Sequence, residues 1–270
     1  MAEIEIIGLP VPESRPRAAV FDFDGTISLI VDGWQEIFMD IFRRALSSFP
    51  GGNEIHDEKI AQIIDQNTGK RTISQAYSLV EEIRKLGGSP EDPLVYLNEF
   101  TRRLKAITAP RVQALKNGVK VENFVVPGIH SCLKMLREHA VKLCLVSGSP
   151  ESVVLKSAEL LGVREFFGDE IHGTRSDDGA FKKSEIFHQF LSKNGISPKE
   201  LIGFGDGFTE TRDVHEMGGL AIGIIFDKNT HSGVNEVRRN RLMEAGADWI
   251  ISDYTCLSDL ESRLFVPEAR

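Results

Sequence analysis

Apolar residues from Trp34 to about Leu115 follow a helical pattern. Four stretches of this segment place apolar side chains three and four positions apart, which is the spacing of an amphipathic helix. Glycines at 51–52 and 87–88 separate these stretches, and Gly118 follows the last one. No stretch alternates apolar and polar residues as a half-buried strand does. We therefore expect this segment to be all-helical.

Short apolar runs on both sides of this segment predict strands, each followed by a helical pattern. The runs lie at residues 17–21, 142–146, near 171, 201–204, 220–226 and 249–252. Strands that alternate with helices in this way form a parallel sheet with helices on both faces. The sequence therefore predicts an α/β fold, with a core formed by residues 1–30 and 125–270 and a helical insertion at 31–124.

Composition narrows the class of protein. The 270 residues carry 32 Lys and Arg against 40 Asp and Glu, a formal charge of −8, whereas nucleic-acid-binding proteins usually have a basic excess. The three cysteines are far apart and form neither a disulfide framework nor a zinc motif, which is typical of reduced thiols in the cytoplasm. The first residues lack the basic region of a signal peptide, and no apolar run approaches the ~20 residues of a membrane span. We expect a cytoplasmic protein with no nucleic-acid or membrane partner, and the sequence does not indicate an oligomeric state.

Polar residues with suitable chemistry follow several of the predicted strands. In an open α/β sheet, ligands bind beyond the carboxyl ends of the strands, where these residues would meet. The set consists of Asp22 and Asp24, Ser147 and Gly148, Lys182 or Lys183, and Asp206 with Glu210. Each motif alone is also typical of a turn, a helix start or a surface pair. Their occurrence together, in this order, indicates a site for phosphate and a divalent cation.

The residue types suit phosphoryl transfer. A carboxylate after the first strand can act as a nucleophile, and a second one can donate and accept the proton. Asp206 adds a hard oxygen ligand of the kind that Mg²⁺ prefers. A lysine would offset charge on the transferred group, and the Ser147 hydroxyl with nearby backbone N–H groups would hold phosphate oxygens.

Four sequence motifs resemble those of the haloacid dehalogenase superfamily. They are VFDFDGTIS at 20–28, LVSGSP at 145–150, the downstream lysine and FGDGFTE at 204–210. The resemblance implies a Rossmann-like core and Mg²⁺-dependent phosphoryl transfer through an aspartyl-phosphate. It also implies a helical cap inserted after the first motif, as in phosphoglycolate phosphatases and β-phosphoglucomutases.

The resemblance also implies a role for each motif residue. Asp22 is the nucleophile, Asp24 the general acid and base, and Lys183 faces the phosphate, with Lys182 as the alternative. The implied metal ligands are Asp22, the backbone carbonyl of Asp24, Asp206 and Glu210. The implied phosphate-binding residues are Thr26, Ser147 and Gly148. Glu210 stands where the family usually has Asp, which leaves Asp213 as a second candidate acid.

The acid at Asp24 indicates the type of reaction. Phosphonate hydrolases and dehalogenases of the superfamily lack Asp at this position, so an oxygen leaving group is expected. We predict a phosphoric monoester hydrolase that acts on a small phosphorylated metabolite, with a phosphomutase of the β-phosphoglucomutase type as the alternative. A non-catalytic sensor of phosphometabolites is the third hypothesis, which the presence of Asp22, Asp24 and Asp206 disfavours.

Three other features allow more than one interpretation. Residues 68–71 (TGKR) lack the glycine and hydroxyl of a phosphate-binding P-loop, so they form either a helix-joining turn or a specificity loop whose Lys70 or Arg71 reaches the substrate. Trp34 is expected to pack inside the cap, with a place in the pocket wall as the alternative. The basic cluster at 238–241 is interpreted as a solvated helix face.

Overall fold

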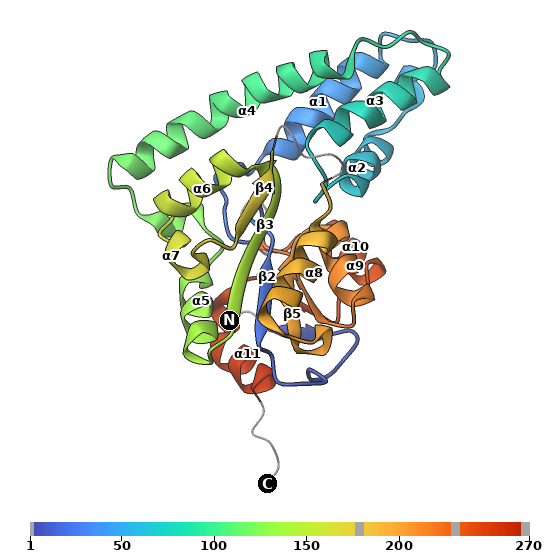
Figure 1. The fold of residues 1–270 in the computed structure, drawn as a ribbon. Helices are drawn as coiled ribbons and strands as arrows, with labels where there is room; N and C mark the ends of the chain where they lie inside the picture. The colour runs from blue at the N-terminus through green and yellow to red at the C-terminus, as the bar shows by residue number, and fades with distance from the viewer. Residues whose placement is uncertain (1–2, 176–180, 228–232, 266–270) are drawn as a thin grey trace.

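A seven-stranded sheet forms the centre of the protein (Figure 1). The computed structural model describes residues 3–175, 181–227 and 233–265. The strand order is β1-β7-β6-β5-β2-β3-β4, and every neighbouring pair is parallel except β1 with β7. The strands are β1 (Ile4–Ile6), β2 (Ala18–Phe21), β3 (Lys142–Pro150), β4 (Ile171–Thr174), β5 (Leu201–Gly205), β6 (Leu220–Ile224) and β7 (Trp249–Ile251).

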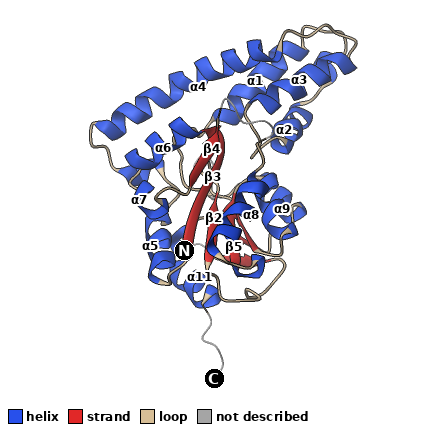
Figure 2. Ribbon diagram, viewed as in Figure 1, coloured by secondary structure: helices blue, strands red, loops and turns tan. Residues whose placement is uncertain are grey.

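Helices fall into an inserted group and a group that packs on the sheet (Figure 2). The inserted helices are α1 (Trp34–Leu46), α2 (Asp57–Gln66), α3 (Ile73–Lys85) and α4 (Pro93–Lys116). The core helices are α5 (Ile129–Glu138), α6 (Glu151–Leu160), α7 (Arg164–Phe167), α8 (Lys183–Asn194), α9 (Phe208–Glu216), α10 (Glu236–Glu244) and α11 (Leu257–Leu264). Short 3₁₀ turns occupy Gly52–Glu54, Val121–Phe124, Pro198–Glu200 and Tyr254–Cys256. Among the described residues, no helix is both long and apolar enough to cross a membrane.

Both faces of the sheet are covered by helices. Successive side chains of a strand point to opposite faces. In β2, Ala19 and Phe21 accordingly join the apolar layer beneath α5, α6, α7 and α11, whereas Ala18 and Val20 join the layer beneath α8 and α9. Phe21 stacks on Phe204 of β5 with ring centroids 4.5 Å apart. The predicted α/β fold with a Rossmann-like core is confirmed.

The inserted helices have an apolar core of their own, which we call the cap core. It joins side chains from α1 to α4, and Phe38 stacks on Phe100 at 4.0 Å between ring centroids. Arg111 of α4 donates hydrogen bonds to the carbonyl oxygens of Ile30 and Asp32, where the chain leaves the sheet domain. Helices α1–α4 lie together at one end of the molecule, at the top of Figure 1. The exact division at residues 30 and 124 stays a prediction.

The sheet differs from the sequence prediction in three places. It is mixed rather than wholly parallel, because the unpredicted strand β1 pairs antiparallel with β7. Strand β6 ends at Ile224 rather than at 226. Strand β3 continues to Pro150, which pairs with Thr174, although its apolar run ends at Val146. Residues 147–149 form an irregularity within β3, because only one residue of β4 lies between the partners of Val146 and Pro150.

Candidate active site

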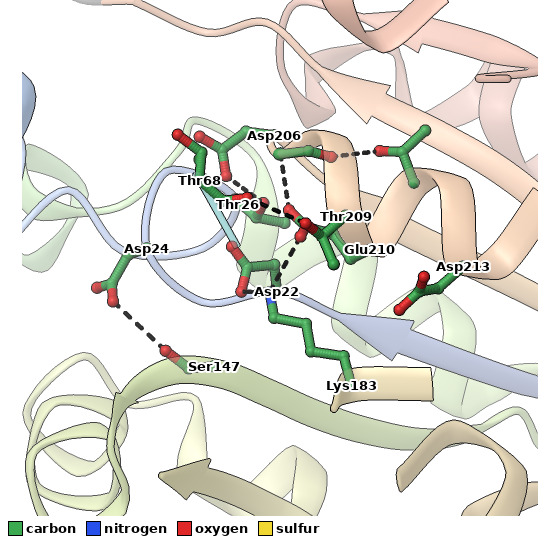
Figure 3. A network of polar contacts seen from close by, with 12 residues as sticks. Asp22, Asp24, Thr26, Thr68, Ser147, Lys183, Asp206, Thr209, Glu210 and Asp213 are labelled. Atoms are coloured by element: carbon green, nitrogen blue, oxygen red, sulfur yellow. Dashed lines mark hydrogen bonds and ion pairs between the residues drawn. The ribbon is translucent and has the colours of Figure 1, made fainter. Parts of the chain in front are cut away.

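The predicted polar residues meet at the carboxyl ends of β2, β3 and β5 (Figure 3). Asp22 directly follows β2 and is 8% exposed. Asp206 follows β5, and Glu210 lies in the first turn of α9. Lys183 is the first residue of α8 and is 2% exposed. The parallel strands thus bring together residues that are far apart in the sequence.

Lys183 forms the centre of a buried ion-pair cluster. Its Nζ lies 2.6 Å from Asp22 Oδ1 and 3.1 Å from Glu210 Oε2. Burial alone would lower the pKa of Lys183, but the Asp22 and Glu210 carboxylates outweigh this effect and raise the pKa, so the lysine stays protonated. Burial raises the pKa of Asp22 well above its usual range, and the adjacent lysine opposes this shift. Lys182 is exposed instead and pairs with Glu185 at 3.2 Å.

The two carboxylates that contact Lys183 and the nearby carboxylate of Asp206 form a set of oxygen donors that suits a divalent cation. Oxygen atoms of Asp22, Asp206 and Glu210 lie within 4.8 Å of one another, and all three residues are buried. The Thr26 hydroxyl donates to Asp206 Oδ1 at 3.2 Å, and the Gly207 N–H donates to Glu210 Oε1 at 2.7 Å, so two of the acids are held in place. Hard oxygen ligands of this kind fit Mg²⁺.

Asp213 lies outside this oxygen cluster. Its carboxylate approaches Arg212 at 3.5 Å, and burial raises its pKa. Figure 3 shows its side chain apart from the group formed by Asp22, Asp206 and Glu210. The geometry therefore favours Glu210 over Asp213 as the acid of the last motif.

Asp24 occupies a different environment from Asp22. Its Oδ2 accepts hydrogen bonds from Ser149 Oγ at 2.7 Å and from Ser147 Oγ at 3.5 Å, and its side chain turns toward Ser147 in Figure 3. Burial raises the pKa of Asp24 to about 6, although the Ser149 hydrogen bond opposes the shift. A carboxyl group with this pKa changes protonation state readily near neutral pH, as a general acid and base must.

A pocket between the sheet domain and the cap contains these two acids. On the sheet side, Asp22, Asp24 and residues 147–149 line it. On the cap side, its lining includes Trp34, Asn67, Thr68, Gly69, Lys70, Thr72, Gln75 and Phe100. Arg71 is not among the described lining residues, and neither is Thr26, which is fully buried.

The loop between α2 and α3 rests directly on the site. A Cβ atom at Gly69, whose φ is +87°, would lie 2.3 Å from Glu210 Oε2, and one at Gly148 would lie 2.4 Å from the Lys70 carbonyl oxygen. The Thr209 hydroxyl also donates to the Thr68 carbonyl oxygen at 3.3 Å. Glycine has no Cβ atom, so at positions 69 and 148 it alone allows these close contacts without a shift of the neighbouring atoms. Residues 68–71 therefore form a helix-joining turn that also helps to close the pocket.

Three site residues were not predicted from the sequence. Ser149 was part of the SGSP motif, but its hydroxyl was not singled out as the partner of Asp24. Arg238 and Arg241 were interpreted as solvated, and this was wrong: their side chains are 13% and 12% exposed. Arg238 lies 3.6 Å from an Asp206 carboxylate oxygen, and Arg241 donates to the Asp206 carbonyl oxygen at 2.9 Å while pairing with Asp65 of the cap.

A second group of residues with metal-binding side chains lies where β3 meets β4. Cys144, Glu170 and His172 place ligand atoms within 4.8 Å of one another. Glu170 is already paired with Lys193 and with His172, so its charge is compensated. Burial raises the pKa of Cys144, which disfavours a thiolate. We assign no metal site there.

Together, these observations describe an α/β core with a helical cap and a buried acidic site at the carboxyl ends of its strands. The chain belongs to the haloacid dehalogenase-like hydrolase family, whose model matches residues 16–212. Similar solved structures include a predicted phosphoglycolate phosphatase from Haemophilus somnus, at a TM-score of 0.60 and 16% identity over 92% of this chain and 99% of the other. They also include a β-phosphoglucomutase from Clostridium difficile, at a TM-score of 0.60 and 15% identity over 92% of this chain and 97% of the other. An HAD family hydrolase from Deinococcus radiodurans, solved with bound phosphate and sodium, has a TM-score of 0.57 and 17% identity over 93% of this chain and 97% of the other.

These structural similarities establish the fold alone, because sequence identities this low do not establish a shared function. No curated protein sequence matches the chain.

The buried lysine leads to a stability prediction. Replacing Lys183 by Met is expected to lower the free energy of unfolding by about 3 kcal/mol, because it leaves buried carboxylates without their cation. Lys182→Met is the matched control, since it makes the same change one residue away on the surface and should alter the value by less than about 0.5 kcal/mol. Urea denaturation in the presence of a chelator measures both. Equal stabilities of the two variants would contradict the assigned cluster.

Proposed function

We propose that the protein is a Mg²⁺-dependent phosphatase that hydrolyses a small phosphorylated metabolite through an aspartyl-phosphate on Asp22. The observation that carries this proposal is the division of two acids between two environments in one pocket. Asp22 contacts a protonated lysine at 2.6 Å, whereas Asp24 is bound by serine hydroxyls and has a pKa of about 6. The Lys183 ammonium favours the ionised form of Asp22, which a nucleophile needs, whereas a pKa of about 6 suits Asp24 to donate and accept a proton.

In the first step, an Asp22 carboxylate oxygen attacks phosphorus and the bond to the leaving alcohol oxygen breaks. Asp24, protonated at this stage, donates its proton to that oxygen, so that a neutral alcohol departs. Lys183 lies beside Asp22 and is placed to offset charge on the transferred group. The step leaves a phosphoryl group on Asp22 and a carboxylate at Asp24.

In the second step, water attacks the phosphorus of the aspartyl-phosphate. Asp24 accepts a proton from this water, and the bond between phosphorus and the Asp22 oxygen breaks. Inorganic phosphate leaves, and both carboxyl groups return to their starting states. Ser149, whose hydroxyl donates to Asp24 at 2.7 Å, is assigned the role of orienting it in both steps.

The metal ligands in this proposal are Asp22, Asp206, Glu210 and the Asp24 backbone carbonyl. Bound Mg²⁺ would supply positive charge next to the transferred phosphoryl group. Thr26 was expected to bind phosphate, but its hydroxyl donates to Asp206, and we assign it the role of positioning that ligand. Ser147 and Gly148 line the pocket and remain the proposed phosphate-binding residues.

The cap side of the pocket is the proposed site for the organic part of the substrate. Lys70 lines it and remains a candidate specificity residue. Arg71 lies outside the described lining and is the weaker candidate. Trp34 lines the pocket and also packs edge-on against Phe38 at 6.2 Å between ring centroids. It therefore serves both as packing inside the cap and as part of the pocket wall.

The three cysteines are buried free thiols, which supports a reducing, cytoplasmic location.

Metal dependence gives the experiment that tests this function. Phosphate release from a panel of phosphorylated metabolites is expected with Mg²⁺ and should fall by about 10³-fold or more with chelator, because a buried acidic site without its cation lacks charge stabilisation. Wild-type thermal unfolding should also shift upward with Mg²⁺, since the folded state alone binds it. The absence of metal-dependent turnover across the panel would count against the proposal.

Product analysis in the same panel separates a phosphatase from a phosphomutase. A phosphatase yields free phosphate and an alcohol, whereas a mutase returns the phosphoryl group to a sugar and yields an isomer. We expect stoichiometric free phosphate. Isomer formation without free phosphate would replace hydrolysis by the mutase alternative while leaving the role of Asp22 unchanged.

A further inference from the structure

The side chain of Gln75 is a buried polar group on the cap side of the pocket. Gln75 lies in the first turn of α3, is 2% exposed and lines the pocket together with Asp22 and Asp24. Its Nε2 donates to the Ile64 carbonyl oxygen at 2.8 Å, which fixes the orientation of the amide because only the NH₂ end can donate. Among the described residues, Gln75 Oε1 has no hydrogen-bond partner.

Two neighbouring polar side chains of the cap, Asn67 and Thr68, already have hydrogen-bond partners. Asn67 Nδ2 donates to the Ile63 carbonyl oxygen at 2.9 Å and to Ser78 Oγ at 2.8 Å, and its Oδ1 accepts from Lys70 Nζ at 3.2 Å. The Thr68 hydroxyl donates to a backbone carbonyl oxygen at 3.3 Å. Gln75 Oε1, in the first turn of α3, is therefore a buried acceptor that a donor on a ligand would satisfy. Burying a polar group without a partner is costly, so a ligand that donates a hydrogen bond to Oε1 would remove this cost on binding.

Apolar side chains form the rest of the cap wall. Trp34, Phe100 and Leu104 line the pocket beside Gln75. Such a wall accommodates a short carbon skeleton, while a few placed polar groups set its orientation. The cap wall beside Gln75 thus offers apolar contact and the Gln75 acceptor, and the sheet domain offers the groups for phosphoryl transfer.

We propose that Gln75 Oε1 selects substrates whose leaving alcohol carries a second hydrogen-bond donor, either a hydroxyl or an ammonium group. The substrate class is a phosphate monoester of a small polyol or amino alcohol. A carboxylate in the position that Oε1 contacts presents only acceptors and gains no hydrogen bond from it. Gln75 acts here as a specificity residue, and this inference rests on the proposed phosphatase function.

Matched substrate pairs test the inference. 3-Hydroxypropyl phosphate is compared with propyl phosphate, and aminoethyl phosphate with ethyl phosphate, so that each pair differs by one donor and keeps the carbon chain. Similar pairs with four to six carbons complete the series, and an aryl phosphate serves as the reference ester. The wild-type protein is expected to favour the donor-bearing member in kcat/KM by about 10- to 100-fold, the range associated with one buried hydrogen bond.

Gln75→Met removes both polar atoms with little change in size. It is expected to reduce the preference within each pair to about twofold or less, mainly through the donor-bearing ester, while turnover of the aryl phosphate stays within about threefold. Gln113→Met is the control, because Gln113 is an exposed residue of α4 outside the pocket lining and its loss should leave every ratio unchanged. Circular dichroism and thermal unfolding verify that the variants are folded.

The possible failures are distinguishable. If the wild-type protein hydrolyses no ester with Mg²⁺, the proposed function fails and the inference falls with it. If it hydrolyses esters without preference for donor-bearing members, or if Gln75→Met keeps the wild-type ratio, the inference alone is overturned. An equal loss on donor-bearing, donor-free and aryl esters also overturns it, because a selective contact cannot act equally on all three.

Discussion

Replacement of Asp22 by asparagine is expected to reduce kcat for phosphate esters by about 10⁴-fold or more, because the amide is a poor nucleophile and cannot form the aspartyl-phosphate. The loss should appear with every ester, including aryl phosphates whose leaving group needs no proton. The loss of kcat should also persist at saturating Mg²⁺, because the substitution removes the nucleophile and does not merely weaken metal binding. Steady-state phosphate release measures it.

The fold is expected to survive this substitution. Asparagine has nearly the same shape as aspartate, and Lys183 retains its contact with Glu210 at 3.1 Å. Asp169→Asn is the control, because Asp169 is exposed in the turn between α7 and β4 and should keep wild-type turnover. A folded Asp22→Asn protein with turnover near that of the control would refute the assignment of the nucleophile.

Asp24→Asn is expected to separate the two steps of the reaction. Asparagine can still accept the Ser149 hydrogen bond but can neither donate nor accept the catalytic proton. With alkyl phosphates both steps suffer, and kcat should fall by about 10²- to 10⁴-fold. With an aryl phosphate the leaving group departs without a proton, so phosphorylation of Asp22 continues while its hydrolysis slows.

This difference predicts a distinctive time course. Rapid-quench measurements should show a burst of the released phenol, close to one per active site, followed by slow turnover. Ser149→Ala is the matched comparison, because it removes the hydrogen bond to Asp24 while keeping the carboxyl group, and it should show a milder loss and no burst. The absence of a burst with the aryl ester, or an equal slowing of the phosphorylation step with alkyl and aryl esters, would contradict the role of Asp24 as acid and base.

Much of the arrangement around the site was predictable from local sequence pattern. The apolar run before Asp22 becomes β2, and the run before Ser147 becomes most of β3. Parallel strands place their carboxyl ends on one edge, so residues 22, 147 and 206 were expected to meet. The helical spacing of the inserted segment was sufficient to predict α1–α4, because each helix buries one face in the cap core.

Features that depend on partners far away in the sequence were not predictable. Strand β1 is three residues long and exists because β7, some 240 positions later, offers it a free edge. Arg241 looked like part of a solvated face, but its partners are Asp65 of the cap and the Asp206 carbonyl oxygen. Gln75 carries no local signal at all, since an isolated glutamine in a helical pattern is ordinary. Tertiary contacts decide such cases, and a single sequence does not reveal them.

The central claim is a covalent phosphoryl group on Asp22, and the Asp24→Asn variant gives the most direct way to observe it. The protein is mixed with Mg²⁺ and an aryl phosphate, quenched in acid during slow turnover, digested and analysed by mass spectrometry. The account predicts that the peptide containing Asp22 gains the mass of one phosphoryl group, that hydroxylamine removes it, and that Asp22→Asn never acquires it. Turnover without any phosphorylated peptide, or a phosphoryl group on another residue, would contradict the account.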